Sequence, residues 1–383
     1  MTTSEHHWLP DHQLDVAATL SHAEELVDQV SDLLFAYQTQ PDGVFEFEEQ
    51  FGLPNTRTVV TKVRPMPKKV PLLVADALVA LRAALEHALF AEIEFRDGVL
   101  GEKPARKVEI PASRTVEDFE SWSKGRVRNG PASLHPGSEL IARIRGLQPF
   151  NRTDSENNPL TRLVLYTNHA KHRNPAVTAV RIAAMYQDDQ RPRSIHDLDP
   201  RSEVPLREGD IIAETPFGQR VPVTLFPTIG INLPGTDRWP ILITELDEIS
   251  HWVRNQAVPR LITGNEPPEP ALPTRYDISV GHGDERSAIT AGSMTTAAER
   301  HQQRLGAASA RLDLVDMIAQ TDRAPGPNKI EAWLVHLTDE AVLERMSRLT
   351  ATDAYDVDVM IRNFGVLMGM RDEVLAFSQD GTD

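Results

Sequence analysis

The stretch from Val70 to Ala91 constrains the fold most, because it is apolar on nearly every face of a helix yet carries charges. A helix with so little polar surface, here about Pro71–Phe95, belongs inside a hydrophobic core. The ionisable residues between Val70 and Ala91 are Asp76, Arg82, Glu86 and His87. Such charges favour a buried helix over a membrane span. We therefore expect neighbours from a distant part of the chain to neutralise them.

An amphipathic helix is predicted before it, over about Asp11–Thr39. Its apolar residues recur at alternating spacings of four and three: Val16, Leu20, Ala23, Val27, Val30, Leu34 and Tyr37. A stripe of this kind stays on one face and packs along another helix. Either an internal helix or a second subunit can fill the seam, and the sequence favours an internal one.

The remaining elements alternate in type along the chain. Strands are expected at 44–48, 58–63, 107–110, 177–185, 211–215, 221–226 and 228–233. Helices are expected at 116–124, 138–145, 159–171 and 239–258, the last ended by Pro259, and at 296–319, 329–337, 339–349 and 357–377. The fold class is thus α+β: a helical core with a β-hairpin and a β-rich layer at about 176–235, followed by a small all-α unit.

A proline-rich segment divides the 383 residues. Four prolines fall in the ten residues from Asn265 to Thr274, which predicts an extended spacer. The expected organisation is an α+β domain at 1–264, a linker at 265–275 and a helical domain at 276–383.

Composition narrows the function classes. The chain has no cysteine, which excludes disulfides, thiolate metal sites and a cysteine nucleophile. Its net charge of −16 disfavours broad binding to a phosphate backbone. The N-terminal residues lack the basic and apolar regions of a signal peptide. A cytoplasmic bacterial protein without a membrane partner is expected.

Residues 15–265 resemble a widespread family of uncharacterised bacterial proteins. The resemblance rests on Leu81-Arg-Ala-Ala-Leu-Glu-His in the apolar helix, the turn Leu147-Gln-Pro-Phe, and Asn168-His-Ala-Lys-His-Arg, in that order. Family members typically carry Asp where Glu86 and Ala170 stand here. The first replacement keeps a carboxylate and the second removes one, which argues against a mechanism that needs both. The resemblance implies a fold and motif positions, but no activity.

Arg82 and His87 also resemble the Arg-x4-His signature of HEPN domains, which are helical ribonucleases of toxin–antitoxin and phage-defence systems. In that hypothesis RNA is the substrate: histidine transfers a proton and arginine stabilises charge on phosphorus. Five helical positions rotate a side chain by about 140°, however, so the two point apart unless the helix turn is distorted or a dimer assembles the site. The structural alternative is an Arg82–Glu86 pair and a His87 bound to a backbone carbonyl.

The second motif, near the end of the helix at 159–171, supplies further candidates. If it packs on the apolar helix, one catalytic cluster is predicted: Arg82, Glu86, His87, Lys171, His172 and Arg173. Histidines at 87, 169 and 172 with a carboxylate define a second hypothesis, a metal-dependent hydrolase. Basic residues at a helix C-terminus are also stabilised by the helix dipole, without any ligand.

The favoured functional hypothesis is a non-catalytic scaffold or sensor in host defence. In it the C-terminal helices bind a protein partner, or the chain forms a homo-oligomer. No cofactor is predicted.

Overall fold

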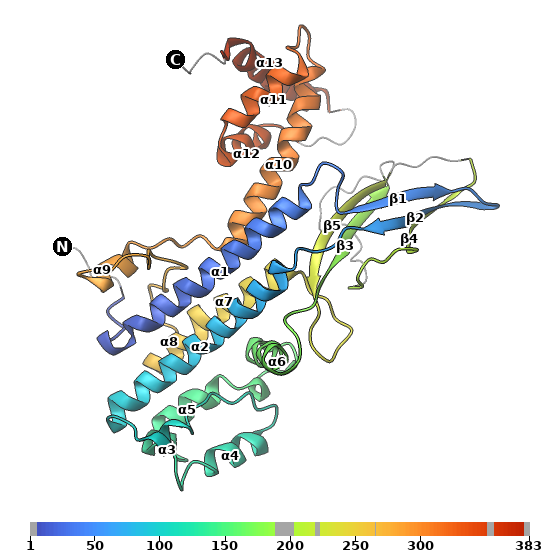
Figure 1. Ribbon diagram of the computed structural model, residues 1–383. Coiled ribbons are helices and arrows are strands. Elements are labelled where there is room, and N and C mark those ends of the chain that lie inside the picture. The colour runs from blue at the N-terminus through green and yellow to red at the C-terminus, as the bar shows by residue number, and fades with distance from the viewer. Residues whose placement is uncertain (1–5, 188–202, 219–222, 265, 351–355, 379–383) are drawn as a thin grey trace.

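Two long helices form the centre of the molecule. The computed structural model describes residues 6–187, 203–218, 223–264, 266–350 and 356–378. Helix α1 (Leu14–Gln38), preceded by a 3₁₀ turn η1 (Asp11–Gln13), lies along α2 (Lys69–Asp97) (Figure 1). Every residue of the predicted stripe on α1 is buried. The expected internal partner for that stripe is therefore confirmed as α2.

Shorter helices surround this pair. Around the far end of α2 lie α3 (Glu102–Ala105), α4 (Val116–Lys124), η2 (Ala132–Leu134), α5 (Glu139–Gly146) and η3 (Pro149–Asn151). Helix α6 (Pro159–His172) packs against α2. The predicted cap Ser138 accepts a hydrogen bond from the backbone N–H of Ile141, which begins α5 as expected.

A helix continues through a proline where a break was expected. Helix α7 (Leu242–Trp252) runs into a π-helical turn, η6 (Val253–Ala257), and then into α8 (Val258–Thr263). The predicted stop at Pro259 is wrong. Pro259 lies in the first turn of α8, where a missing N–H is tolerated. A π turn of this kind accommodates a local change in the hydrogen-bond ladder.

The strands form two small antiparallel sheets. One has the order β1 (Phe45–Gln50), β2 (Asn55–Val63), β4 (Ile211–Pro216); the other pairs β3 (Thr178–Gln187) with β5 (Val223–Ile231). They share a minor core of Val60, Ile182 and Ile212. Residues 188–202 and 219–222 of the predicted β-rich layer lie outside the described residues.

Two strand predictions need correction. The strands expected at 221–226 and 228–233 are one strand, β5, in which Pro227 is opposite Ile182, beside a register shift between Ile182 and Ala184. A bulge there tolerates the absent N–H of proline. No strand forms at 107–110: side chains of α2, described below, satisfy both polar backbone groups of Ile110.

The C-terminal unit has its own core, carried by one long helix. Helix α10 (Ala297–Ala319) begins in the main core, through Ala297 and Ala298, and reaches the second core at Ala307. Around its far part pack α11 (Pro327–His336), α12 (Asp339–Ser347) and α13 (Val357–Ala376), which stand apart from the body in Figure 1. The predicted fold class, α+β with a helical C-terminal unit, is confirmed.

The proline-rich segment is not a free spacer. Leu272, Thr274 and Tyr276 are buried in or against the main core, and α9 (Glu285–Thr290) follows before α10. Asn265, where the predicted linker begins, lies outside the described residues. The two cores therefore meet within α10 rather than at residues 265–275.

Candidate functional site

Arg82 and Glu86 form an ion pair on α2, as the structural alternative predicted. Arg82 Nη2 lies 2.6 Å from Glu86 Oε1, one helical turn apart. The same guanidinium donates to the carbonyl of Ile110 at 2.5 Å, and Glu86 Oε2 accepts from the Ile110 N–H at 3.1 Å. This pair takes the place of a neighbouring strand for Ile110. Both side chains are thus occupied by a structural contact.

Burial also sets the acidity of Glu86. Desolvation raises the pKa of its carboxyl group, while Arg82 and the Ile110 N–H oppose that rise. A carboxyl group with a raised pKa suits proton transfer, but here its oxygens face Arg82 and a backbone N–H. The geometry supports a clamp on residues 107–110 more directly than an acid catalyst.

His87 lies elsewhere. Its side chain is exposed, and Nδ1 is 3.2 Å from the Thr19 hydroxyl of α1. The expectation that His87 is hidden and bonds a backbone carbonyl is wrong. Because Arg82 faces Ile110 and His87 faces α1, the structure does not bring the two HEPN-like residues to one contact within the described chain.

The second motif meets α2 at a different level. His169 lies with Ala75 and Leu78 around a shallow depression between α6 and α2. Glu86 is eight residues beyond Leu78, or about 12 Å along the helix axis. This helix end does pack on α2, but at a level remote from Glu86.

The C-terminal end of α6 points into solvent. Lys171, His172 and Arg173 are all exposed, and His169 Nδ1 bonds the carbonyl of Asn174 at 3.1 Å. Within the described ranges, no group of three or more His, Asp or Glu residues is arranged to hold a metal ion. The six predicted catalytic residues therefore lie in three separate places.

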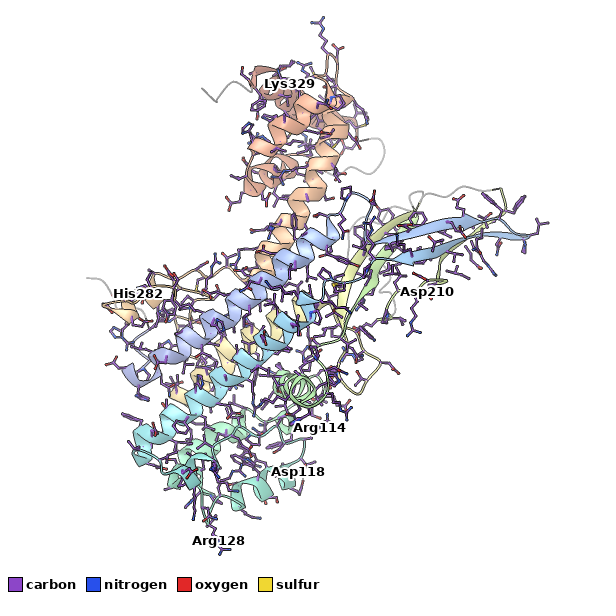
Figure 2. The ribbon with its side chains drawn as sticks, viewed as in Figure 1. Arg114, Asp118, Arg128, Asp210, His282 and Lys329 are labelled. Atoms are coloured by element: carbon purple, nitrogen blue, oxygen red, sulfur yellow. The ribbon has the colours of Figure 1, made fainter. Side chains whose placement is uncertain are left out.

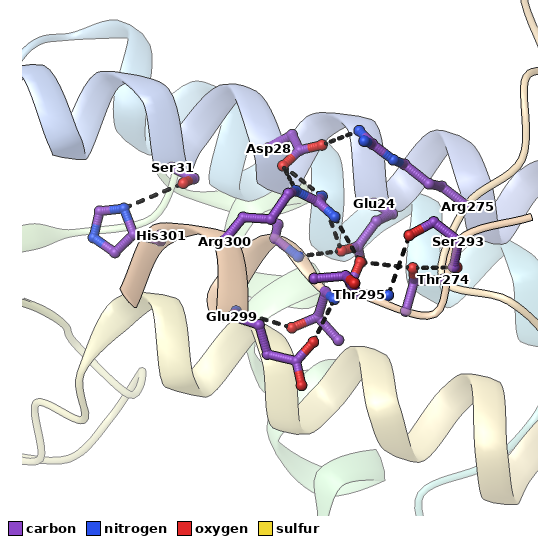
Figure 3. A network of polar contacts seen from close by, with 12 residues as sticks. Glu24, Asp28, Ser31, Thr274, Arg275, Ser293, Thr295, Glu299, Arg300 and His301 are labelled. Atoms are coloured by element: carbon purple, nitrogen blue, oxygen red, sulfur yellow. Dashed lines mark hydrogen bonds and ion pairs between the residues drawn. The ribbon is translucent and has the colours of Figure 1, made fainter. Parts of the chain in front are cut away.

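A buried network that the sequence did not reveal joins α1 to α10 (Figure 3). Glu24, only 2% exposed, accepts from the backbone N–H of Ala297 at 2.5 Å and lies 3.5 Å from Arg254. Arg254, also 2% exposed, donates to the carbonyl of Thr274 at 3.0 Å. Glu24 thus binds the first turn of α10, to which a carboxylate is well suited.

Two further contacts extend this network along the same helices. Arg300 Nη2 lies 2.6 Å from Asp28, which also pairs with Arg275 at 2.8 Å. Thr296 and Glu299 form a capping box that begins α10. The start of α10 is therefore fixed by its own capping box and by Glu24 and Asp28 of α1, with which Arg254 and Arg275 pair in turn.

Burial perturbs the acidity of the central pair. Desolvation raises the pKa of Glu24 and lowers the pKa of Arg254, while each residue's charge opposes the shift of the other. Shifts of this kind accompany functional sites and structural ion pairs alike. Here every partner is a chain segment that the network holds in place, so we read it as structural.

A cleft lies beside this junction. It is lined from α1, β5, α7 and α10. Its polar lining residues are Gln38, Thr228, Thr244, His301 and Gln302. His301 Nε2 is 3.2 Å from Gln38 Oε1, and its Nδ1 is 3.2 Å from Ser31. Burial lowers the pKa of His301, which favours the neutral ring. Its nitrogens are therefore already engaged by α1.

The most distinctive surface lies on α13. This helix buries Val359, Met370 and Val374, of which Met370 and Val374 belong to the second core. Its exposed side is also apolar, through Val357, Ile361, Phe364 and Leu375, which are 47% to 65% exposed. Figure 2 shows Lys329 in the C-terminal unit and Arg128 at the opposite end of the molecule. The Lys329 ammonium donates to the carbonyl of Leu375 at 3.0 Å. The sequence shows the spacing of these apolar residues, but it does not tell which of the two apolar faces packs on the core.

Comparison with known proteins adds no relative. No protein-family model matches the chain, no curated protein matches it, and no solved structure matches it. No helix among the described residues has the length and apolar character needed to cross a membrane. The resemblances to an uncharacterised family and to HEPN domains stay predictions.

Proposed function

We propose that this protein is a non-catalytic scaffold or sensor whose C-terminal helices bind a protein partner. The observation that carries the proposal is the second apolar face of α13. A singly exposed apolar residue is ordinary on a protein surface, whereas a contiguous patch marks an interaction site. On α13, four large apolar residues share one face between Val357 and Leu375.

The predicted catalytic residues on α2 and α6 also support a non-catalytic role, because they are separated or already engaged. Arg82 and Glu86 are engaged by Ile110, and the second motif lies about 12 Å away along α2. The body of the molecule serves in this proposal as the base on which the C-terminal unit is held.

The test is co-purification with proteins encoded by neighbouring genes, using the full chain as bait. Phe364→Glu introduces a charge into the face and should abolish recovery of the partner. Val335→Glu is the matched control, because Val335 is 77% exposed on α11, outside the face. Equal recovery with both variants would refute the proposal.

A truncation needs a corrected position. A chain ending near residue 270 would remove Leu272, Tyr276 and Ala297 from the main core and so damage the body. Ending instead at Gly306, just before the second core begins at Ala307, removes only the C-terminal unit. Loss of the partner with retained helical circular dichroism of the body is the expected result.

The two enzymatic hypotheses are tested with the same preparations. A ribonuclease requires RNA breakdown that His87→Ala abolishes without unfolding, and a metal-dependent hydrolase requires a bound divalent ion in elemental measurements. Either finding would replace the scaffold proposal.

A further inference from the structure

The exposed face of α13 consists of Val357, Ile361, Phe364, Met368 and Leu375, here called the outer stripe. At about 100° per residue these five positions fall within roughly 60° of one another. The residues that α13 buries in its own core lie on the other side of the helix. Met368 is half-buried and the other four are exposed. The helix is thus built to contact apolar surfaces on two sides.

The rest of this sequence offers little to cover the outer stripe. Outside the described residues, the segments next to α13 read Ala-Thr-Asp-Ala-Tyr at 351–355 and Gln-Asp-Gly-Thr-Asp at 379–383. The longest, 188–202, holds seven charged residues and only Ile195 and Leu198 as large apolar ones. These segments therefore supply few apolar side chains that could match the outer stripe.

We propose that a second copy of this chain covers the outer stripe, with the two α13 helices antiparallel about a twofold axis at the level of Val366. This register places Val357 opposite Leu375 of the second copy, since each lies nine residues from Val366. It likewise places Phe364 opposite Met368, two residues on either side. A twofold interface requires such self-complementarity, and this register uses the full stripe.

The positions of charged residues on α13 are also complementary in this antiparallel register. Arg362 is exposed and makes no ion pair with any residue in the described part of the chain. In the antiparallel pair it lies on the same flank as Asp372 of the second copy, with an axial offset of about 3 Å. Asp372 contacts only the adjacent Arg371 among the described residues. One such cross-pair forms on each side of the axis.

The area is of the right order for a dimer. The exposed parts of the outer stripe amount to on the order of 500 Å² per copy, comparable to the largest patches found on monomers. Polar rim residues such as Arg362 and Asp372 extend this toward the roughly 800 Å² per partner of a stable interface.

The chain's lack of cysteine makes a sharp test available. Gly365 and Gly369 are both exposed on α13, and a Cβ added to either meets no atom within 4 Å. In the proposed pair the two copies of residue 365 are offset by about 3 Å along the axis, and those of residue 369 by about 9 Å. Gly365→Cys should therefore form a covalent dimer on mild oxidation or with a short bismaleimide, and Gly369→Cys should not.

Light scattering across a concentration series supplies the second measurement. The unmodified full chain and Val335→Glu should have the mass of a dimer, and Ile361→Glu that of a monomer. Cross-linking of both cysteine variants equally, or of neither, would overturn the antiparallel pair, as would a monomer for the unmodified chain.

This inference rests on the proposed function, since it names the occupant of the same face, but the two fail separately. A monomeric chain whose neighbouring-gene partner is lost in Phe364→Glu overturns the dimer and leaves the scaffold. A cross-linked dimer whose partner recovery is the same in Phe364→Glu and Val335→Glu supports the dimer and removes partner binding from α13.

Discussion

Replacing Glu24 with glutamine should destabilise the protein strongly, although the change is nearly isosteric. Glutamine keeps an oxygen to accept from the Ala297 N–H, but it removes the negative charge 3.5 Å from Arg254. At an effective dielectric constant of about 20, that attraction is worth roughly 5 kcal/mol. Arg254 is 2% exposed, and among the described residues it keeps only the Thr274 carbonyl as a close acceptor. Loss of one partner of a buried pair typically costs about 3–5 kcal/mol of unfolding free energy.

The measurement is denaturant unfolding followed by both tryptophan fluorescence and circular dichroism, because coincident transitions are needed for a two-state value. Asp32→Asn is the control: it breaks the pair with Arg304 between the same two helices, but those side chains are 67% and 35% exposed. Its expected cost is about 1 kcal/mol or less.

The double variant Glu24→Gln with Arg254→Met completes a double-mutant cycle for this buried pair. Because it leaves no unpaired buried charge, it should be more stable than Glu24→Gln alone. Additive costs, or a cost for Glu24→Gln no larger than that of the exposed control, would refute the argument that Glu24 neutralises Arg254 inside the core.

Three further predictions concern the helices around this junction. Leu85→Ala should cost about 2–5 kcal/mol of unfolding free energy, since Leu85 is fully buried, and Leu72→Ala on the same helix, where the side chain is 53% exposed, should cost much less. Glu86→Ala should leave the Ile110 N–H without its acceptor, costing about 1–3 kcal/mol and speeding hydrogen exchange at that amide; unchanged exchange would contradict the clamp. Burial lowers the pKa of His301 from 6.5, so its contribution to stability is present above that value and is lost as the pH falls toward the folded-state pKa. His301→Gln should therefore lose less stability than the unmodified chain between pH 7.5 and 5, and parallel pH profiles of the melting temperature would contradict this.

Local periodicity predicted most helices, because the spacing of apolar residues within each helix indicates which of its faces is buried. The alternating stripe of α1 and the bounds of α4 and α10 follow from side-chain spacing and capping residues alone. The pairing of Arg82 with Glu86 is equally local, since the two are one turn apart.

The errors arose where a distant contact decides the local structure. Residues 107–110 read as a strand by alternation, but α2 supplies their hydrogen-bond partners. Pro227 predicts the end of a strand, but a bulge in β3 opposite it lets β5 continue. Pro259 predicts the end of a helix, but a π turn before it lets the helix continue into α8. The sequence also gave no sign that Glu24 would meet Arg254, because 230 positions separate them. A candidate site assembled from such contacts could not be predicted from one sequence.

The way α10 belongs to both cores determines how the C-terminal unit is presented. Its residues 300–304 are held by Asp28, Ser31 and Asp32 of α1, and its second core begins at Ala307 with the helix unbroken. A continuous helix transmits orientation as a rigid arm does, whereas a loop would let the unit swivel. The exposed face of α13 is consequently held at a set angle to the sheets and the long helices. A lasting change in that angle would require α10 to bend or its contacts with α1 to break.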